Sequence, residues 1–318
     1  MKHDPARYLA PKATQGAALA LGTMNFGKRT DERASLAIAA RALDAGLELF
    51  DTANVYGDGA SERIVGKALR ALGRDRVLVA TKVGLMRRGG KPEGLSPAAI
   101  ARAIDESLAN LGTDHVDLYW LHAPDPQVPL AETLGAVARL VESGKVRAYG
   151  MSNYAAWEIL EAAHPDALGG GPRPVAAQQI YNLLVRQLDL EYFRFAARHG
   201  VHTTVYNPLA GGLLATATAT GVRFTKNAMY QRRYATPGMA ARAEAYAKLA
   251  AEAGRSLLEL AYGFVAGHAG VDSILVGPAS LEHLEAALAA CVPLDPELRA
   301  KVDALAVDLD GTDARYAR

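Results

Sequence analysis

Cysteine is almost absent from this sequence, which has 318 residues and a single cysteine, Cys291. An internal disulfide is therefore impossible, and a metal site built from several cysteines is excluded. We interpret Cys291 as a small apolar residue late in a helix, and we expect no metal site elsewhere.

The sequence also has no large excess of charge of one sign and no long apolar run. Lysine and arginine number 35 against 34 aspartate and glutamate residues, so no basic field exists to bind nucleic acid or an anionic membrane. No run approaches the roughly 20 apolar residues that span a bilayer, and the first stretch, MKHDPARYLAPKATQG, lacks a signal-peptide core. We expect a cytoplasmic protein without nucleic-acid or membrane partners, and a local anion site is compatible with this composition.

Short apolar runs alternate with alanine-rich amphipathic segments along the chain. Eight runs are typical of strands buried on both faces: 18–22, 46–50, 77–82, 116–121, 146–151, 175–180, 202–206 and 272–276. Helices are expected at 31–45, 61–72, 97–111, 130–143, 186–199, 238–253, 256–267 and 281–290. Thr30 or Asp31 would cap the first helix and Ser280 the last. The repeats predict one α/β domain over residues 1–318, a (β/α)8 TIM barrel.

The alternative fold is a doubly wound open sheet. Such a sheet normally has a glycine-rich dinucleotide turn after its first strand, and GTMNFG at that place does not fit G-x-G-x-x-G. A long connection of 71 residues (277 − 206) follows the seventh strand of the predicted barrel. We interpret its polar part, residues 212–237, as a long loop that folds over a ligand at the catalytic rim.

Polar side chains recur just after consecutive strands. Asp51 and Tyr56 follow the second strand, Lys82 ends the third, His122 follows the fourth and Ser152 the fifth. The intervals from Asp51 to Lys82, to His122 and to Ser152 are 31, 40 and 30 residues, close to the roughly 30 residues of a βα unit. We therefore expect these groups on one rim of the barrel, where such folds do chemistry.

These residue types form a set that can protonate a carbonyl oxygen. Tyr56 would be the general acid, and a nearby Lys82 is expected to lower its pKa from the usual value near 10. Asp51 would pair with Lys82, and His122 would hydrogen-bond the substrate oxygen. Each residue has an ordinary structural explanation when taken alone, but the joint placement is more specific. Because no flavin or metal signature is visible, a nicotinamide is the natural hydride donor.

The sequence resembles the aldo-keto reductases along nearly its whole length. The resemblance rests on LFDTANVYGDGASERIVGKAL, VLVATKVG, DLYWLHAPDP, GKVRAYGMSNY, PVAAQQIYN, VYNPLAGGLL and ILVGPASLEHLEAAL, which occur in the family's order. It implies a TIM barrel, NAD(P)H as hydride donor and reduction of an aldehyde or ketone. It also implies that Asp51, Tyr56, Lys82 and His122 form the catalytic tetrad.

The resemblance further implies a set of cofactor-binding residues. Ser152, Asn153 and Gln178 would hold the nicotinamide carboxamide, Tyr206 would stack on the ring, and the segment after it would lie near the pyrophosphate. Uncharged donors and acceptors do suit a carboxamide, and Gly211 allows close backbone approach to phosphate. The full implied set is Thr23, Met24, Asp51, Ser152, Asn153, Gln178, Tyr206, Asn207, Pro208, Leu209, Gly211, Gly277, Ser280 and His283.

Two parts of the sequence depart from the family pattern: the segment around His283, where Ala286 and Ala287 also replace polar groups, and the position after His122. Many members have an arginine for the adenosine 2′-phosphate where this chain has His283, although Ser280 and the following helix N-terminus could bind phosphate. The resemblance favours NADPH, and NADH remains an alternative. Ala123 replaces a bulky aromatic residue found in many members, which predicts a more open substrate pocket.

The expected substrate is a small carbonyl compound. The segment RFTKNAMYQRRY resembles the aflatoxin-aldehyde and succinic-semialdehyde reductase branch, so its two arginines could anchor an anionic substrate or the cofactor phosphates. Two solvated arginines are the alternative interpretation. The expected substrate-binding residues are Asn25, Phe26, Tyr56, Met86, His122, Tyr154, Arg232 and Arg233.

Other functions are weaker readings of the same sequence. Potassium-channel β subunits share the barrel, so a cofactor-binding regulatory protein with little turnover is the main alternative. A metal-dependent hydrolase is disfavoured because ALALGTM has no His-x-His pair. The sequence leaves open the physiological carbonyl, the direction of the reaction and the oligomeric state.

Overall fold

Eight parallel strands close into a barrel in a computed structural model that describes residues 5–9, 16–164, 169, 171–217 and 228–310. Around the barrel the strand order is β1-β10-β9-β8-β7-β6-β3-β2, so the first strand pairs with the last. The predicted TIM barrel is confirmed, and the open sheet is excluded. The barrel strands are β1 (Ala18–Gly22), β2 (Leu49–Asp51), β3 (Leu78–Val83), β6 (Val116–Leu121), β7 (Val146–Ser152), β8 (Ala176–Ile180), β9 (His202–Tyr206) and β10 (Ser273–Val276).

The barrel interior is filled by side chains of alternating strand residues. Every residue of β3 and β6 is buried, which explains their near-continuous apolar sequences. Gly150 of β7 leaves room for the indole of Trp120, because a Cβ there would stand 2.5 Å from the ring. The interior is therefore a packed core rather than a channel.

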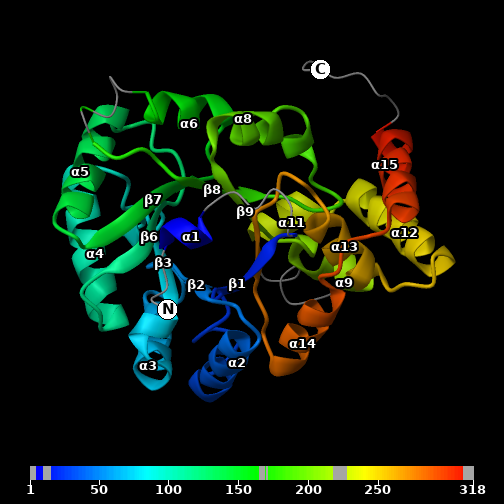
Figure 1. Ribbon diagram of the computed structural model, residues 1–318, viewed down its shortest axis with the longest axis horizontal. Helices are drawn as coiled ribbons and strands as arrows, with labels where there is room; N and C mark the ends of the chain where they lie inside the picture. Colours follow the sequence, from blue (N-terminus) through cyan, green and yellow to red (C-terminus); the bar gives the residue numbers. More distant parts are fainter. Residues whose placement is uncertain (1–4, 10–15, 165–168, 170, 218–227, 311–318) are drawn as a thin grey trace.

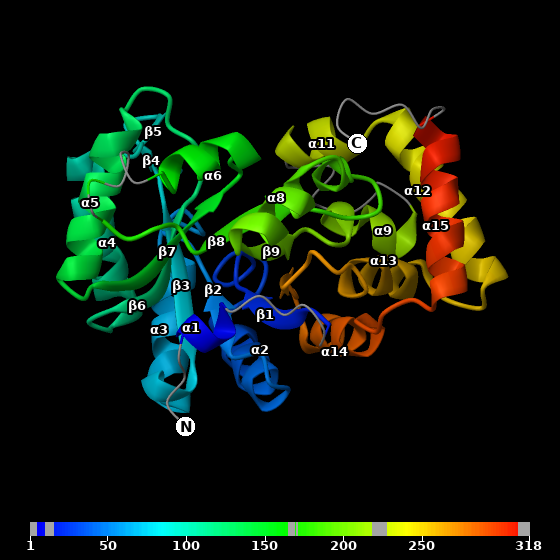
Figure 2. The ribbon, with the colours of Figure 1, turned by 45° about the horizontal axis from the view of Figure 1, so that its top comes forward.

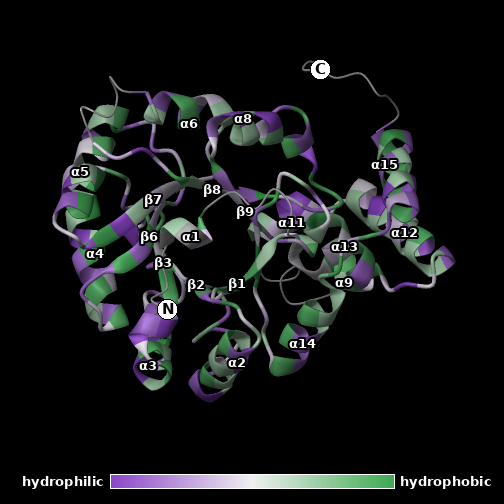
Figure 3. Ribbon diagram, viewed as in Figure 1, coloured by the Kyte–Doolittle hydropathy of each residue, from purple (hydrophilic) through white to green (hydrophobic). Residues whose placement is uncertain are grey.

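Helices surround the barrel, and Figure 3 shows them banded with hydrophilic and hydrophobic residues. Asp31 caps α2 by accepting from the Ala34 nitrogen at 2.8 Å, and Ser280 caps α14 in the same way. The longer helices are α2 (Glu32–Asp44), α3 (Ala60–Leu72), α4 (Pro97–Leu111), α5 (Leu130–Glu142), α8 (Tyr192–His199), α12 (Pro237–Glu252), α13 (Leu257–Ala266), α14 (Leu281–Ala290) and α15 (Pro296–Asp310), and α6 (Ala156–Ala162) is a shorter one.

Some elements differ from the sequence predictions. The helix predicted over 186–199 begins only at Tyr192, after the 3-10 turn η2 (Gln187–Asp189). Helices α6 and α15 and the hairpin β4 (Arg87–Arg88) and β5 (Lys91–Pro92) were not predicted. The predicted loop over 212–237 begins at the end of the 3-10 turn η3 (Ala210–Gly212) and contains the short helices α9 (Leu213–Thr216) and α11 (Ala228–Tyr234). Residues 218–227 of that loop lie outside the described residues.

The amino-terminal end of the barrel is closed by α1 (Pro5–Tyr8), which lies across the ring of strands in Figure 1. Tyr8 and Leu9 are buried against a small core that includes Leu49, Leu78 and Leu118. Figure 2 shows the β4–β5 hairpin and α11 toward the opposite side of the molecule from α1. The two ends of the barrel are therefore built differently.

The single cysteine follows α14 and is partly buried. Burial raises the pKa of the Cys291 thiol to about 12, so the thiol is protonated and unreactive near neutral pH. This agrees with its interpretation as a small apolar residue.

Candidate active site

A buried ion pair lies at the carboxyl ends of two neighbouring strands. Asp51 ends β2 and Lys82 is in β3, and the ammonium group donates to the Asp51 carboxylate and to the Thr52 carbonyl oxygen, the latter at 2.7 Å. The other Asp51 oxygen accepts from Trp120 Nε1 at 3.0 Å and from Gln178 Nε2 at 2.9 Å. Asp51 is therefore held from β3, β6 and β8 at once.

Tyr56 and His122 complete a cluster above this pair. The Lys82 Nζ lies 5.0 Å from the centroid of the Tyr56 ring. The Tyr56 and His122 rings meet edge to face, with centroids 6.1 Å apart. Tyr56 is only partly exposed, and the other three side chains are buried. The structure thus brings together all four residues that the sequence analysis expected on one rim.

Burial controls the protonation of this cluster. It raises the pKa of Tyr56 well above 10, and the Asp51 carboxylate adds to the rise. It lowers the pKa of Lys82, against the attraction of Asp51. It also lowers the pKa of His122 to about 3, with Lys82 contributing. Near neutral pH the tyrosine is therefore a phenol and the histidine a neutral imidazole.

The expectation that Lys82 lowers the pKa of Tyr56 is wrong for this structure. Asp51 compensates the charge of Lys82 in the pair beneath the ring. Desolvation of the phenol is therefore the larger influence on the pKa of Tyr56, and it raises that pKa. The phenol is consequently kept in the form that can donate a proton.

Residues behind the tetrad stabilise its position. The hydroxyl of Thr23, which was expected to bind the cofactor, donates to the Asp51 carbonyl oxygen at 3.0 Å. The distance from Thr23 Oγ1 to Ser61 Oγ is 2.8 Å, and sequence reasoning missed Ser61. Trp120 looked like an ordinary core residue in VDLYWL. The signal that could have found it is that Trp120 stands two residues before His122, the residue that directly follows β6.

Asn153 connects the ends of neighbouring strands at the rim. Its Nδ2 donates to the His122 carbonyl oxygen at 2.8 Å, and its Oδ1 accepts from the Tyr206 hydroxyl at 2.6 Å. Its φ of 65° is left-handed, which a non-glycine residue rarely adopts. Together with buried Ser152 and Gln178, it offers the uncharged donors and acceptors that suit a carboxamide.

The segment after β9 has a second cluster of unusual backbone angles. Asn207 has a φ of 63°, and its side chain accepts from the Gly211 nitrogen at 2.7 Å and donates to the Tyr234 hydroxyl at 2.8 Å. Gly211 and Gly212 have φ values of 74° and 111°. Because space is open at the Cβ position of Gly212, a ligand phosphate could approach this backbone closely. Pro208 is buried and Leu209 partly exposed beside it.

The other proposed cofactor residues follow β10 and β1, the next two strands around the barrel after β9. Gly277 and His283 are exposed, and the Ser280 hydroxyl accepts from the His283 nitrogen at 3.3 Å. Met24 is partly exposed at the end of β1. This edge therefore offers a helix N-terminus and an imidazole, without a lysine or arginine in the motif.

Two of the expected substrate residues serve the structure instead. Asn25 is buried and donates to the carbonyl oxygens of Gly277 and Pro278 at 3.0 and 3.2 Å. Phe26 is completely buried in the main core. Our substrate proposal therefore does not extend to these two residues.

The remaining expected substrate residues stay near the rim or on α11. Tyr154 is buried and donates to the Ala123 carbonyl oxygen at 3.2 Å, whereas Met86 is partly exposed. Arg232 and Arg233 are exposed on α11. Burial raises the pKa of Tyr206 and Arg233 opposes that rise, which places Arg233 close to the rim.

Comparison with known proteins agrees with this geometry. The model of the Aldo/keto reductase family matches residues 18–307. The chain is 33% identical over 306 residues to an uncharacterized oxidoreductase named YrpG from Bacillus subtilis (strain 168), which covers 92% of each protein. Over 196 residues it is 41% identical to aflatoxin B1 aldehyde reductase member 2 of Homo sapiens, which covers 61% of this chain but 54% of that relative.

A further relative has a different printed role. The chain is 30% identical over 302 residues to a probable voltage-gated potassium channel subunit beta of Oryza sativa subsp. japonica, covering 89% of this chain and 90% of the relative.

The barrel fold, the buried ion pair beneath a tyrosine ring and the family match together identify the class of protein as an oxidoreductase with its site at the rim of a barrel. The chain belongs to the aldo/keto reductase family, whose general activity is carbonyl reduction with a nicotinamide cofactor. Across the described part of the chain, no helix combines the length and apolar character required to cross a membrane.

Proposed function

We propose that this protein reduces a small aldehyde or ketone to an alcohol with NAD(P)H, and that Tyr56 is the general acid. The observation that carries the proposal is the buried Asp51–Lys82 pair beneath the Tyr56 ring, with His122 facing that ring. We also propose that the protein acts in the cytoplasm as one barrel domain over residues 1–318.

Each residue of the tetrad has a distinct role in this proposal. When bound, the nicotinamide supplies the hydride to the carbonyl carbon. The Tyr56 hydroxyl gives its proton to the developing alkoxide, and the neutral His122 orients the carbonyl oxygen through a hydrogen bond. Lys82 stabilises the phenolate that remains, and Asp51 keeps the ammonium in place.

The chain offers residues that fit the cofactor. One observation is that the buried His122 Nδ1 has no hydrogen-bond partner in the part of the chain that the structure describes, as expected for a site built to receive a ligand. Ser152, Asn153 and Gln178 would hold the carboxamide, and Tyr206 would stack on the ring. The bond from Gln178 to Asp51 uses the amide nitrogen, so its oxygen can accept from the carboxamide.

We propose NADPH as the preferred cofactor, with NADH as the alternative. The family favours NADPH, but His283 stands where many members have an arginine. A His283→Arg variant should shift the ratio of kcat/KM values toward NADPH, because a guanidinium forms a bidentate contact with the 2′-phosphate. An unchanged ratio would show that this position does not read the phosphate.

The substrate proposal concerns the two arginines of α11. The relatives include proteins named aflatoxin B1 aldehyde reductase, and Arg233 lies close to Tyr206 at the rim. We propose that Arg232 and Arg233 anchor an anionic aldehyde. Arg→Met variants should raise KM for succinic semialdehyde more than for the neutral 4-nitrobenzaldehyde. Equal KM values for wild type and variants with both substrates, at unchanged cofactor affinity, would refute the idea.

A regulatory protein is the second candidate, because the rice relative is named a potassium channel subunit beta. Multiple turnovers with saturating cofactor distinguish an enzyme from a protein that binds the cofactor but turns over little.

The decisive experiment follows NADPH and NADH oxidation at 340 nm with 4-nitrobenzaldehyde and succinic semialdehyde. Wild type should turn over, and Tyr56→Phe should be slower by about 100-fold or more because the general acid is lost. Tyr149→Phe is the control, since Tyr149 is a buried tyrosine that donates to the Pro172 carbonyl oxygen. Equal losses in both variants, or no binding of either cofactor, would refute the proposal.

A further inference from the structure

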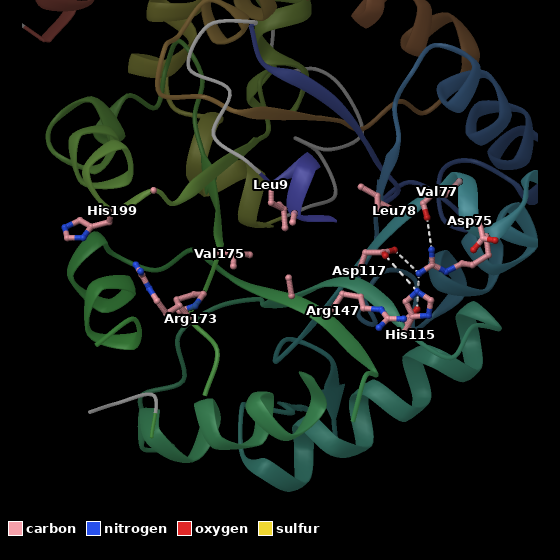
Figure 4. Close-up of a pocket in the computed structure, with 15 residues that line it drawn as sticks. Leu9, Asp75, Val77, Leu78, His115, Asp117, Arg147, Arg173, Val175 and His199 are labelled. Atoms are coloured by element: carbon pink, nitrogen blue, oxygen red, sulfur yellow. Dashed lines mark hydrogen bonds and ion pairs between the residues drawn. The ribbon is translucent and has the colours of Figure 1, made fainter. Parts of the chain in front are cut away.

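A cavity of about 840 Å³ lies at the amino-terminal end of the barrel, opposite the tetrad. Its walls include residues that precede or begin strands, such as Val77, Leu78 and Val175, whereas the tetrad lies at or after the carboxyl ends of strands. Figure 4 shows Arg147 and His115 on one side, Arg173 and His199 on the other, and Leu9 with Val175 between them. We call this cavity the amino-terminal pocket.

Two arginines of this pocket come from chain segments that lead into neighbouring strands. Gly150 pairs with Ala176, so Arg147 and Arg173, each three residues earlier, occupy equivalent positions on neighbouring chain segments. His199, the last residue of α8, also lines the pocket. The two arginines are therefore neighbours around the rim rather than scattered surface residues.

The acids at the pocket do not neutralise these two arginines. Asp117 accepts from Arg74 Nη2 and from the Val79 nitrogen, both at 2.8 Å. His115 is bonded to Asp114 outside the pocket lining. The side chains of Arg147 and Arg173 are exposed and make no hydrogen bond or ion pair with the described residues. Asp75 is the other acid in the lining, and it is exposed.

The floor of the pocket between the two arginines is apolar and packs in or against the small core at this end of the barrel. Leu9, Leu78, Ala148 and Val175 line it, and Leu9 and Leu78 belong to the core that α1 closes. The volume is in the usual range for small-molecule sites. Anionic oxygens are the partners that a guanidinium binds best, and a carbon skeleton would cover the apolar floor.

We propose that the amino-terminal pocket binds a small organic anion with at least two carboxylate or phosphate groups, held by Arg147 and Arg173. This site is separate from the proposed nicotinamide site, and it does not depend on the proposed reaction. A free tricarboxylate and a phosphorylated compound share the required chemistry, so the test distinguishes them.

The test is isothermal titration of citrate and of pyrophosphate into the full chain at low ionic strength, where exposed charges are screened least. At least one of the two anions should bind to wild type. Arg147→Met and Arg173→Met should each weaken that binding about tenfold or more, because each removes a charge-assisted contact. The anion with the stronger response identifies carboxylate or phosphate as the preferred group.

Lys248→Met is the matched control, because Lys248 is an exposed cation on α12 outside the pocket lining. It should change affinity by less than about twofold, since it alters the net charge equally without touching the pocket. Absence of heat with both anions overturns the proposal. So does binding that all three variants weaken alike or leave intact, which would place the anion elsewhere, including the cofactor rim.

Discussion

At the scale of single residues, Asp51 is the group on which the site depends most. Its two oxygens accept from Lys82, Trp120 and Gln178, which come from three different strands. A buried carboxylate with this many donors is fixed in direction. The proposed acid Tyr56 therefore stands over a pair whose geometry is set by the barrel itself.

Asp51→Asn tests this dependence. The amide removes the charge that compensates buried Lys82, so the free energy of unfolding should fall by about 3–5 kcal/mol. Urea unfolding measures the loss. The double variant Asp51→Asn with Lys82→Met should be less destabilised than the single variant, because it buries no uncompensated charge. A single variant as stable as wild type would show that the pair does not matter for folding.

The pH dependence of the reaction follows from the cited pKa shifts. Carbonyl reduction needs protonated Tyr56, so activity is present below its pKa and lost as pH rises through it. Because that pKa is raised well above 10, kcat/KM should stay flat from about pH 6 to 9. His122, with a pKa of about 3, is neutral throughout this range and adds no acid limb. A descending limb centred near pH 7 would contradict this assignment.

The gathering of the four proposed catalytic residues at one rim was predictable, because they lie at or after the ends of consecutive strands at the spacing of a βα unit. The direction of the pKa shift of Tyr56 was not predictable, because it depends on how deeply the phenol is buried and on the compensation of the Lys82 charge by Asp51. The structural role of Asn25 also escaped prediction, because its hydrogen bonds to Gly277 and Pro278 join segments 252 residues or more apart in the chain. Residue type alone does not reveal such long-range partners.

At the scale of elements, strands were predicted better than helices. The apolar runs at 18–22, 116–121 and 202–206 match β1, β6 and β9 without a shift. Burial on both faces makes such strands almost continuously apolar. Helix α15, by contrast, buries only Leu298 and Val302 firmly and has little apolar periodicity. Short α6 and α11 are seven residues each, below the length at which periodicity is informative.

Gly150→Ala tests the contact between β7 and β6. The added methyl group would meet the Trp120 ring at 2.5 Å and the Ala176 carbonyl oxygen at 2.6 Å, so one of them must move. We expect a loss of about 1–3 kcal/mol in the free energy of unfolding and lower turnover, because Trp120 donates to Asp51. Chemical denaturation and the 340 nm assay measure the two effects.

The control for that variant is Gly135→Ala in α5. The new methyl group there meets only Arg139, at 3.8 Å, and alanine favours the helix by up to about 1 kcal/mol. Stability should therefore stay level or rise, with unchanged turnover. If Gly150→Ala behaved in the same way, the close packing of Trp120 would not constrain this site.

At the scale of the whole molecule, the barrel has the proposed active site at one end and the closing segment α1 at the other. The tetrad and the proposed cofactor residues gather at the carboxyl ends of the strands, while Tyr8 and Leu9 close the other end. The closing segment was not predicted, because MKHDPARYLAPKATQG has too few apolar residues to indicate a packed element. Its packing depends on a surface formed by residues from distant strands.

Tyr8→Ala tests the contribution of this closure. Tyr8 is 7% exposed, so its truncation should lower the free energy of unfolding by about 2–5 kcal/mol. Turnover at 25 °C should change little, because the tetrad lies at the other end. Trp157→Ala is the control, since that ring is 65% exposed and should cost less than about 0.5 kcal/mol. Equal stability of the two variants would mean that α1 does not seal the barrel.

The pairing of β1 with β10 has a consequence for the newborn chain. Ala18 pairs with Ser273, so 255 residues (273 − 18) separate the partners that complete the ring. At about 5–20 residues per second, a ribosome needs roughly 13–50 s to deliver the second partner after the first. During that time β1 keeps an unpaired edge that could join another chain. Closure of the ring therefore has to wait until nearly the whole barrel has been synthesised.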